Sequence, residues 1–268
     1  MPTPSVPPDR PRRRSLAGAR VLLTGGSSGV GRALALELAR RGAALFATAR
    51  RGDLLDALAA ERPIAVLAGD VTDDEFRRRL VAAARERLGG IDVVVAAAGS
   101  GAIGEFATSD PATLRRVMEI DFFAPAELVR LALPALRQGH DPAVILVGSI
   151  LGLHALPLHA DYCAAKAALH ALAATLRAEL APEGIGVLLA ALGPTESGFW
   201  SHLLAGARPA WSRGRPLGAA ATARAIATAL ERRRPLVCPG LSAKGFALAA
   251  RFFPGTLDRV IRRRMSRG

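Results

Sequence analysis

Seven short apolar runs typical of buried strands recur along the chain, and helical stretches of ten or more residues separate most of them. The runs are 21–24, 44–49, 64–68, 91–97, 143–149, 185–192 and 236–238. Strands joined by such long crossovers must run parallel, with their helices on the two faces of the sheet. The pattern predicts an α/β fold: an open, doubly wound parallel sheet between two helical layers, in a single domain.

The ends of the chain differ from this body. Residues 1–15 contain five Pro and the run Arg12-Arg13-Arg14, and they lack the apolar stretch of a secretory signal. We expect a disordered Pro/Arg-rich tail there and the folded domain over residues 16–240. Residues 241–268 are predicted to form a basic amphipathic extension with apolar side chains at helical spacing among arginines: Leu257, Val260, Ile261 and Met265.

The net charge of +13 is concentrated at these two ends. Five Arg stand against one Asp in residues 1–20, and six Arg against one Asp in residues 251–268, so the body is only weakly basic. Because the body lacks aromatic residues interleaved with basic ones, we expect no nucleic-acid partner. The two cysteines, Cys163 and Cys238, cannot form a disulfide framework and fit a reducing, cytoplasmic location. No apolar run is long enough to span a bilayer.

A glycine-rich turn follows the first apolar run and begins the first helical stretch. It reads Thr24-Gly25-Gly26-Ser27-Ser28-Gly29-Val30-Gly31. Glycines let a backbone approach a pyrophosphate closely, and the following helix start directs free N–H groups at the charge. The context predicts a dinucleotide-binding loop, with all of these residues except Gly26 as candidate contacts.

Arg50 and Arg51 directly follow the second apolar run, where NAD-binding sheets commonly carry an acid for the ribose 2'-hydroxyl. A guanidinium can grip a 2'-phosphate, so this pair favours NADP(H), although a solvated pair in an Arg-rich chain is the alternative. Asp70 and Val71 follow the third run as further cofactor candidates. The Asp70 carboxylate can accept from the adenine amine, or it can belong to a helix start beside Thr72.

The single tyrosine, Tyr162, and one of only two lysines, Lys166, stand four residues apart, on one face of a predicted helix. Ser149 ends the fifth apolar run, thirteen residues before the tyrosine. The three side chains are therefore expected to converge at the carboxyl edge of the sheet, where open α/β folds bind their ligands.

The loop at residues 24–31, Ser149 and Tyr162-x-x-x-Lys166 together resemble the short-chain dehydrogenase/reductase family, over about residues 16–240. The resemblance implies a Rossmann-like fold and hydride transfer between NADP(H) and a carbonyl or alcohol. It implies that Tyr162 is the general acid/base, that Lys166 lowers the pKa of its phenol, and that Ser149 orients the substrate oxygen.

Two positions depart from the family pattern. The family usually reads Asn-Asn-Ala-Gly after its fourth strand, whereas this chain reads Ala96-Ala97-Ala98-Gly99, with Ala97 and Gly99 as cofactor candidates. The family's Asn in the proton relay corresponds to Asp121. A carboxylate there is expected to stabilise the Lys166 ammonium and to oppose ionisation of Tyr162. The chain contains no Asn at all. Its composition is therefore as good an explanation of both changes as an altered function is.

The segment after the sixth run resembles the family's nicotinamide-carboxamide contact, with Gly193, Thr195 and Ser197 as candidates. Residues 194–215 correspond to the variable substrate loop, whose apolar content suggests either a hydrophobic substrate or simple lid packing. His154 and His159 have no third ligand at suitable spacing, so no metal site is expected.

These observations favour an NADP-dependent oxidoreductase that interconverts a carbonyl and a secondary or primary alcohol. The alternatives are a non-catalytic dinucleotide-binding module of the same fold and an adaptor that contacts anionic surfaces or nucleic acid through its arginine-rich ends. The resemblance implies a homo-oligomer, a homodimer or homotetramer. The basic amphipathic helix suggests peripheral membrane contact, with packing on its own subunit or a neighbour as the other interpretation.

Overall fold

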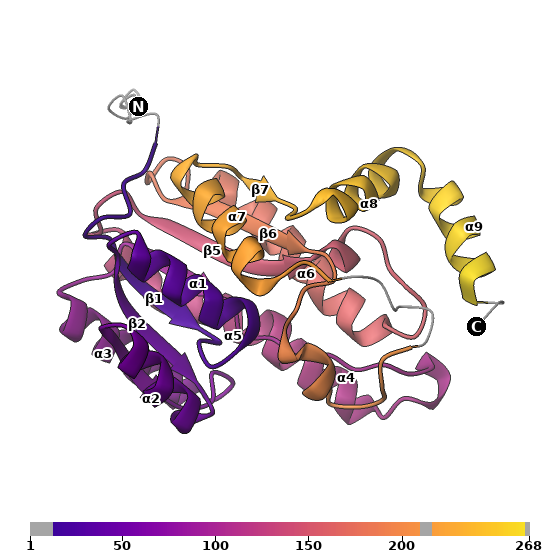
Figure 1. Cartoon of the computed structure of the whole chain (residues 1–268), viewed down its shortest axis with the longest axis horizontal. Helices are drawn as coiled ribbons and strands as arrows, with labels where there is room; N and C mark the ends of the chain where they lie inside the picture. The colour runs from indigo at the N-terminus through magenta and orange to yellow at the C-terminus, as the bar shows by residue number, and fades with distance from the viewer. Residues whose placement is uncertain (1–12, 210–215, 266–268) are drawn as a thin grey trace, which may run out of the picture.

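Seven parallel strands form one sheet in the order β3-β2-β1-β4-β5-β6-β7 (Figure 1). The structure is a computed structural model that describes residues 13–209 and 216–265. The strands are β1 (Arg20–Thr24), β2 (Ala44–Ala49), β3 (Ile64–Ala68), β4 (Val93–Ala96), β5 (Ala143–Ser149), β6 (Gly186–Leu192) and β7 (Leu236–Val237). All seven predicted strands are therefore present, and the doubly wound α/β fold is confirmed.

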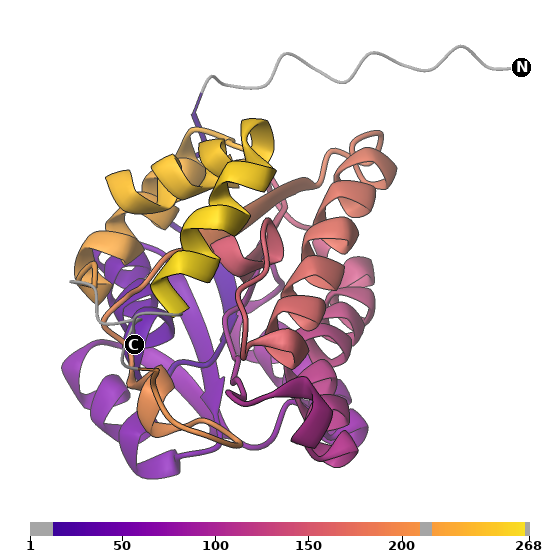
Figure 2. The same cartoon turned by 90° about the vertical axis from the view of Figure 1, so that its right-hand side faces the viewer.

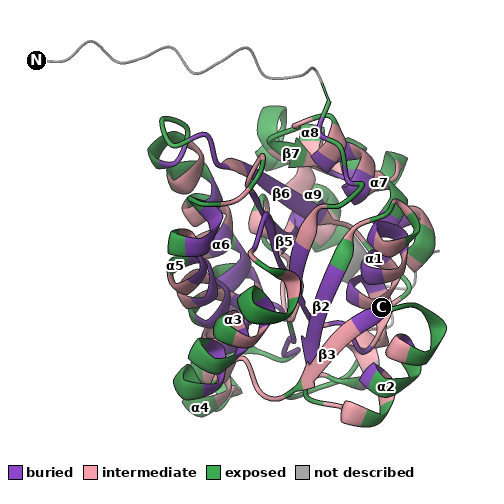
Figure 3. Ribbon diagram, turned by 90° about the vertical axis from the view of Figure 1, so that its left-hand side faces the viewer, coloured by how far each residue is buried: buried purple, intermediate pink, exposed green. Residues whose placement is uncertain are grey.

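Helices cover both faces of this sheet. Those whose buried side chains join the cluster on one face are α1 (Gly29–Arg40), α2 (Gly52–Glu61) and α7 (Ala219–Glu231). The other face carries α3 (Asp74–Leu88), α5 (Ala124–Leu136) and α6 (Ala160–Glu179). The remaining α-helices are α4 (Pro111–Met118), α8 (Leu241–Phe252) and α9 (Pro254–Met265). Figure 3 shows the buried central strands between the helical layers, with the edge strand β3 only partly buried.

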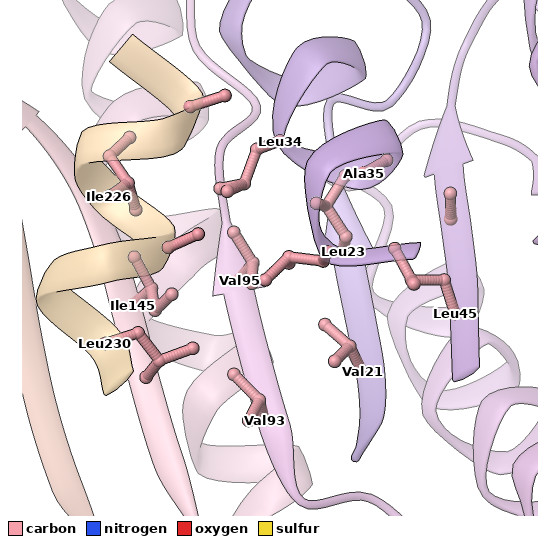
Figure 4. Close-up of a cluster of buried hydrophobic side chains, with 14 of the residues drawn as sticks. Val21, Leu23, Leu34, Ala35, Leu45, Val93, Val95, Ile145, Ile226 and Leu230 are labelled. Atoms are coloured by element: carbon pink, nitrogen blue, oxygen red, sulfur yellow. The ribbon is translucent and has the colours of Figure 1, made fainter. Parts of the chain in front are cut away.

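The strands are apolar at nearly every position because the sheet is buried on both sides. Val21 and Leu23 belong to one core cluster and Leu22 to the other, as the two-residue period of a strand requires. Figure 4 shows Leu34 of α1 and Ile226 of α7 directed at the strands of the first cluster. Full burial of one such side chain contributes about 1.5–3 kcal/mol to the stability of the fold. Many such side chains are buried between the layers, and their packing holds the edge of the sheet in place.

The strand order creates the crevice in which a ligand can bind. The chain runs outward from β1 through β2 to β3, then returns to the centre and runs outward through β4, β5 and β6. The connections after β1 and β4 therefore leave toward opposite faces of the sheet, and the space between them opens at the carboxyl edge. The predicted cofactor loop follows β1, and residues 97–99 follow β4.

The boundary predicted for the amino-terminal tail needs correction at Arg14. Its side chain is 4% exposed and forms an ion pair of 3.2 Å with Asp141, and its backbone N–H donates to the Glu231 carbonyl at 2.8 Å. Local composition gave no sign of this distant acidic partner. Residues 1–12 of the predicted tail lie outside the described residues, as do residues 210–215 of the substrate loop and residues 266–268.

Candidate active site

The glycine-rich turn is closed by contacts that leave no space for side chains. Gly25 has a φ of 78°, and a Cβ on it would lie 2.7 Å from the Ala98 backbone nitrogen. A Cβ on Gly31 would lie 2.1 Å from the Gly25 carbonyl oxygen. The Thr24 hydroxyl accepts hydrogen bonds from the Ala97 and Ala98 N–H groups at 3.1 and 3.2 Å. The loop after β1 is thereby fixed to the loop after β4, across the crevice.

The start of α1 fits the pyrophosphate of a dinucleotide. Ser28 is the N-cap residue, yet its side chain makes no capping hydrogen bond to the first turn within the described chain. Gly29 has a φ of 54°, and a Cβ on it would lie 2.8 Å from the Ser197 Cβ. The first N–H groups of a helix have no partner within the helix, so this uncapped, glycine-lined turn can bind an anion.

Of the two arginines after β2, Arg51 contacts the loop. Its guanidinium donates to the Ser27 hydroxyl at 3.0 Å and to the Ser28 hydroxyl at 2.7 Å, and it lies 2.8 Å from the His202 Nε2. The Arg50 side chain is exposed beside it. Residues 50–51 and the two serines thus form a basic, hydroxyl-rich corner at one end of the crevice.

Asp70 lies in a tight turn after β3 and not at the start of a helix. Its carboxylate accepts from the Thr72 N–H at 2.9 Å and hydroxyl at 2.8 Å, and it pairs with Arg116 at 3.1 Å. Burial alone would raise the pKa of Asp70, but these hydrogen bonds and the Arg116 charge hold it below its ordinary value. The N-cap of α3 is Asp73 instead. The adjacent Val71 carbonyl accepts from Arg77 at 2.8 Å, and the adenine contact stays a prediction.

The three predicted catalytic side chains lie at the carboxyl end of β5 and on α6. Ser149 is the last residue of β5, and its hydroxyl accepts from the Leu151 N–H at 3.1 Å. Tyr162 and Lys166 share one face of α6, with the Lys166 ammonium 5.6 Å from the centre of the Tyr162 ring. The ammonium also donates to the Val147 carbonyl at 3.2 Å, so β5 holds it in position.

Asp121 pairs with Lys166, as predicted from its alignment with the family's Asn. The Oδ1 atom lies 3.0 Å from the ammonium and accepts from the Ser100 N–H at 3.3 Å. Asp121 is fully buried in a π-helical segment, Glu119–Phe123, that joins α4 to α5. A Cβ on Gly99 would lie 2.8 Å from Oδ1, so the small residue at position 99 makes room for the carboxylate. Sequence reasoning missed the Ser100 contact, for which no local pattern gives a signal.

Asp121, Tyr162 and Lys166 shift one another's pKa values. Burial raises the pKa of Tyr162; Lys166 and a hydrogen bond with Ser149 act in the lowering direction, and the Asp121 charge adds to the rise. The lowering expected from Lys166 is present, but burial outweighs it. Burial alone would lower the pKa of Lys166, but the Asp121 charge and the tyrosine raise it, so the ammonium stays protonated. Burial also raises the pKa of Asp121, an effect that Lys166 opposes.

The described part of the substrate loop, residues 194–209, closes over this site. The Phe199 ring packs edge-on against Tyr162, with their centres 5.3 Å apart. The Ser100 hydroxyl donates to the His202 carbonyl at 3.0 Å, and the Leu204 N–H donates to the Gly101 carbonyl at 2.8 Å. These contacts attach the loop to the segment that follows β4.

Hydrogen bonds within the chain hold the start of this loop in a tight turn. The Thr195 hydroxyl donates to the Gly193 carbonyl at 2.9 Å, and the Ser197 hydroxyl donates to the Thr195 carbonyl at 3.4 Å. Ser197 also adjoins Gly29, as the close approach at that glycine shows. Of the three predicted residues of this segment, Ser197 therefore lies beside the glycine-rich turn.

The two histidines between Ser149 and Tyr162 contact protein groups outside the catalytic side chains. The His154 Nε2 lies 2.9 Å from the Asp258 carboxylate, and His159 is buried with its Nδ1 2.7 Å from the Pro157 carbonyl. Among the described residues, no three His, Cys, Asp or Glu side chains gather as metal ligands. No helix within residues 13–209 and 216–265 has the length and apolarity to cross a membrane.

Comparisons with known proteins agree with this geometry. A family model described as short chain dehydrogenase matches residues 19–207. A short chain dehydrogenase of Pseudocercospora fijiensis is 35% identical over 199 residues, which are 71% of this chain and 63% of that protein. The chain thus spans less than two thirds of that relative's length.

Two solved structures cover nearly the whole fold. A short-chain dehydrogenase from Streptomyces avermitilis has a TM-score of 0.78 and 32% identity, over 92% of this chain and 96% of the other. One from Burkholderia cenocepacia, in complex with NADP, has a TM-score of 0.81 and 26% identity, over 92% and 99%. Together with the family model and the convergence of Ser149, Tyr162 and Lys166, these matches show that the chain belongs to the short-chain dehydrogenase family.

Proposed function

We propose that this oxidoreductase is NADP-dependent and interconverts a carbonyl compound with the corresponding secondary or primary alcohol. The observation that carries the proposal is the convergence of the partly buried Tyr162, the buried Lys166 and the Ser149 hydroxyl beside a glycine-lined helix start. A proton donor and an anion-binding turn at one sheet edge are what hydride transfer to a carbonyl requires.

In this mechanism the Tyr162 phenol transfers a proton to the substrate oxygen, or accepts it in the oxidation direction. Bound NADPH would supply the hydride. The raised pKa keeps Tyr162 protonated near neutral pH, which suits the reduction direction. Ser149 hydrogen bonds the substrate oxygen and orients it, and Lys166 favours the phenolate that remains after proton transfer.

The cofactor preference is proposed from the basic corner. Arg51 already contacts the Ser27 and Ser28 hydroxyls, and Arg50 stands exposed beside it. A 2'-phosphate bound between these groups would receive charge-assisted hydrogen bonds, whereas a bare 2'-hydroxyl would gain far less. The NADP-bound Burkholderia structure supports the same choice.

The substrate is proposed to be an apolar carbonyl or alcohol. The Phe199 ring against Tyr162 and the adjacent Trp200 ring, 5.3 Å from Phe199, provide an aromatic surface above the proton donor. Such a surface gains free energy by covering apolar groups of a ligand.

The proton-donor role is tested with Tyr162→Phe. Loss of a general acid typically costs 100-fold or more, so we expect kcat with NADPH and an apolar ketone to fall at least about 100-fold. NADPH should still bind, as measured by quenching of protein fluorescence. Near-native turnover in the variant contradicts the assignment. If the wild-type protein binds NADPH but does not oxidise it with any ketone or aldehyde of a broad panel, the protein is the non-catalytic module.

The cofactor preference is tested with Arg50→Ala and Arg51→Ala. Removing one charge-assisted contact to the 2'-phosphate should weaken NADPH binding about 10- to 100-fold, because such contacts are worth about 1.5–3 kcal/mol. NADH affinity serves as the internal control and should change little. An equal loss for both cofactors in both variants would show that the arginines support the loop and not the phosphate.

A further inference from the structure

Helix α8 exposes an apolar stripe where a surface helix normally carries polar side chains. Leu241, Leu248 and Phe252 are 85%, 59% and 61% exposed. They stand at relative positions 0, 7 and 11 of the helix, so at 3.6 residues per turn they share one face. The opposite face already packs on the domain, with Ala243 and Phe246 against Ile150. Both faces of α8 are therefore apolar, and one of them lacks a partner within the described chain.

The stripe continues into the junction with α9. Figure 2 shows α8 and α9 as the gold and yellow helices at the C-terminal end of the chain, and we refer to residues 241–265 as the α8–α9 arm. Of the ten large apolar side chains exposed in the described chain, five lie in this arm: Leu241, Leu248, Phe252, Phe253 and Val260. Exposed apolar side chains concentrated in this way mark an interaction site.

The α8–α9 arm is basic as well as apolar. Its exposed basic side chains are Lys244, Arg251, Arg259, Arg262 and Arg263. The acidic residue in the arm, Asp258, contacts His154 of the domain at 2.9 Å. Lys244 and Arg251 are seven residues apart and so flank the apolar stripe along one side. An apolar stripe bordered by cations is the pattern of a helix that lies in the headgroup region of a bilayer.

We propose that the α8–α9 arm docks on anionic membrane surfaces, with the stripe among the acyl chains and the basic side chains at the lipid phosphates. A second copy of the chain fits less well, because a symmetric contact would bring these cations together. Nucleic acid would satisfy the cations but would leave Leu241, Leu248 and Phe252 in water. A lipid surface satisfies both halves of the pattern.

The test is sedimentation of the full chain with vesicles of phosphatidylcholine containing phosphatidylserine, and with phosphatidylcholine alone. Binding is expected on the anionic vesicles at low salt and should fall at high salt, because attraction of the basic side chains is screened. The double variant Leu248→Ser/Phe252→Ser should lose at least about tenfold in vesicle affinity. Phe106→Ser is the matched control, since Phe106 is 69% exposed outside the arm.

The outward-facing variants leave the contacts of Ala243, Phe246 and Asp258 with the domain in place, so an unchanged circular dichroism spectrum is expected. Should the double variant not fold, Lys244→Glu/Arg251→Glu provides the independent test and should also lose at least about tenfold on anionic vesicles. Absence of binding at low salt overturns the proposal, as does wild-type affinity in a folded variant. If analytical ultracentrifugation instead shows that Leu248→Ser/Phe252→Ser separates a dimer, a second copy covers the stripe and the membrane proposal is wrong.

Discussion

At the residue scale, the site depends on a buried ion pair that lies beside the Tyr162 phenol. Asp121 and Lys166 lie 3.0 Å apart with almost no exposure, and Tyr162 packs beside them. Asp121 raises the pKa of both neighbours, with opposing consequences for the phenolate: it keeps Lys166 charged, which favours the phenolate, and it raises the pKa of Tyr162, which disfavours it. The carboxylate therefore adds to the rise in the pKa of Tyr162 that burial causes.

Asp121→Asn should move the pH profile of alcohol oxidation toward lower pH. Removing the negative charge lowers the pKa of Tyr162, so the phenolate required for oxidation forms at lower pH. The rate of NADPH formation, measured across pH at saturating alcohol, checks this. Asp53→Asn, a carboxylate at the exposed start of α2, is the control and should leave the profile unchanged. An unshifted Asp121→Asn profile would mean that the carboxylate does not act on the phenol.

At the element scale, the loop before α1 is determined by close backbone contacts and not by helix propensity. Gly31 lies inside α1, where alanine would normally stabilise a helix, but the space for a methyl group is taken by the Gly25 carbonyl. Gly245 lies inside α8, and a Cβ on it would have no neighbour within 4 Å. A glycine-to-alanine substitution would therefore clash at position 31 and meet open space at position 245.

Gly31→Ala should destabilise the protein and weaken NADPH binding. The added Cβ would lie 2.1 Å from the Gly25 carbonyl oxygen, so the glycine-rich turn would have to move. Gly245→Ala is the matched control and should stabilise by about 0.5–1 kcal/mol with unchanged NADPH affinity. Urea unfolding measures the first quantity and cofactor titration the second. If Gly31→Ala binds NADPH as tightly as the control does, the loop adapts and the close contact is not required.

At the scale of the whole molecule, the candidate cofactor residues come from distant parts of the sequence. The turn after β1, the arginines after β2 and the segment after β6 meet at one edge, where Arg51 contacts Ser28 and Ser197 adjoins Gly29. A ligand that bridges these segments binds the folded chain and not the unfolded one. Its binding free energy is therefore added to the stability of the fold.

NADPH at about 100 times its Kd should add about 2.7 kcal/mol to the free energy of unfolding. For a chain of this size the Tm should rise by roughly 5–10 °C. Differential scanning calorimetry with NADPH and NADH at equal concentration checks this, and NADH should give the smaller rise. Tyr162→Phe should keep the NADPH rise, whereas Arg51→Ala should reduce it. A larger rise with NADH would contradict the proposed preference.

The sequence alone determined the strands, the glycine-rich turn and the Tyr162–Lys166 spacing, because each is a pattern within one element. It could not tell that Arg51 contacts the phosphate loop while Arg50 stays exposed, since neighbouring residues of equal charge have equal local signals. Nor could it find the partner of Arg14, which lies 127 positions away, or of Asp70, whose ion pair is with Arg116. Hydrophobic periodicity fixes which face of an element is buried. Only the packing of the elements decides which polar side chains from distant segments come within hydrogen-bonding distance.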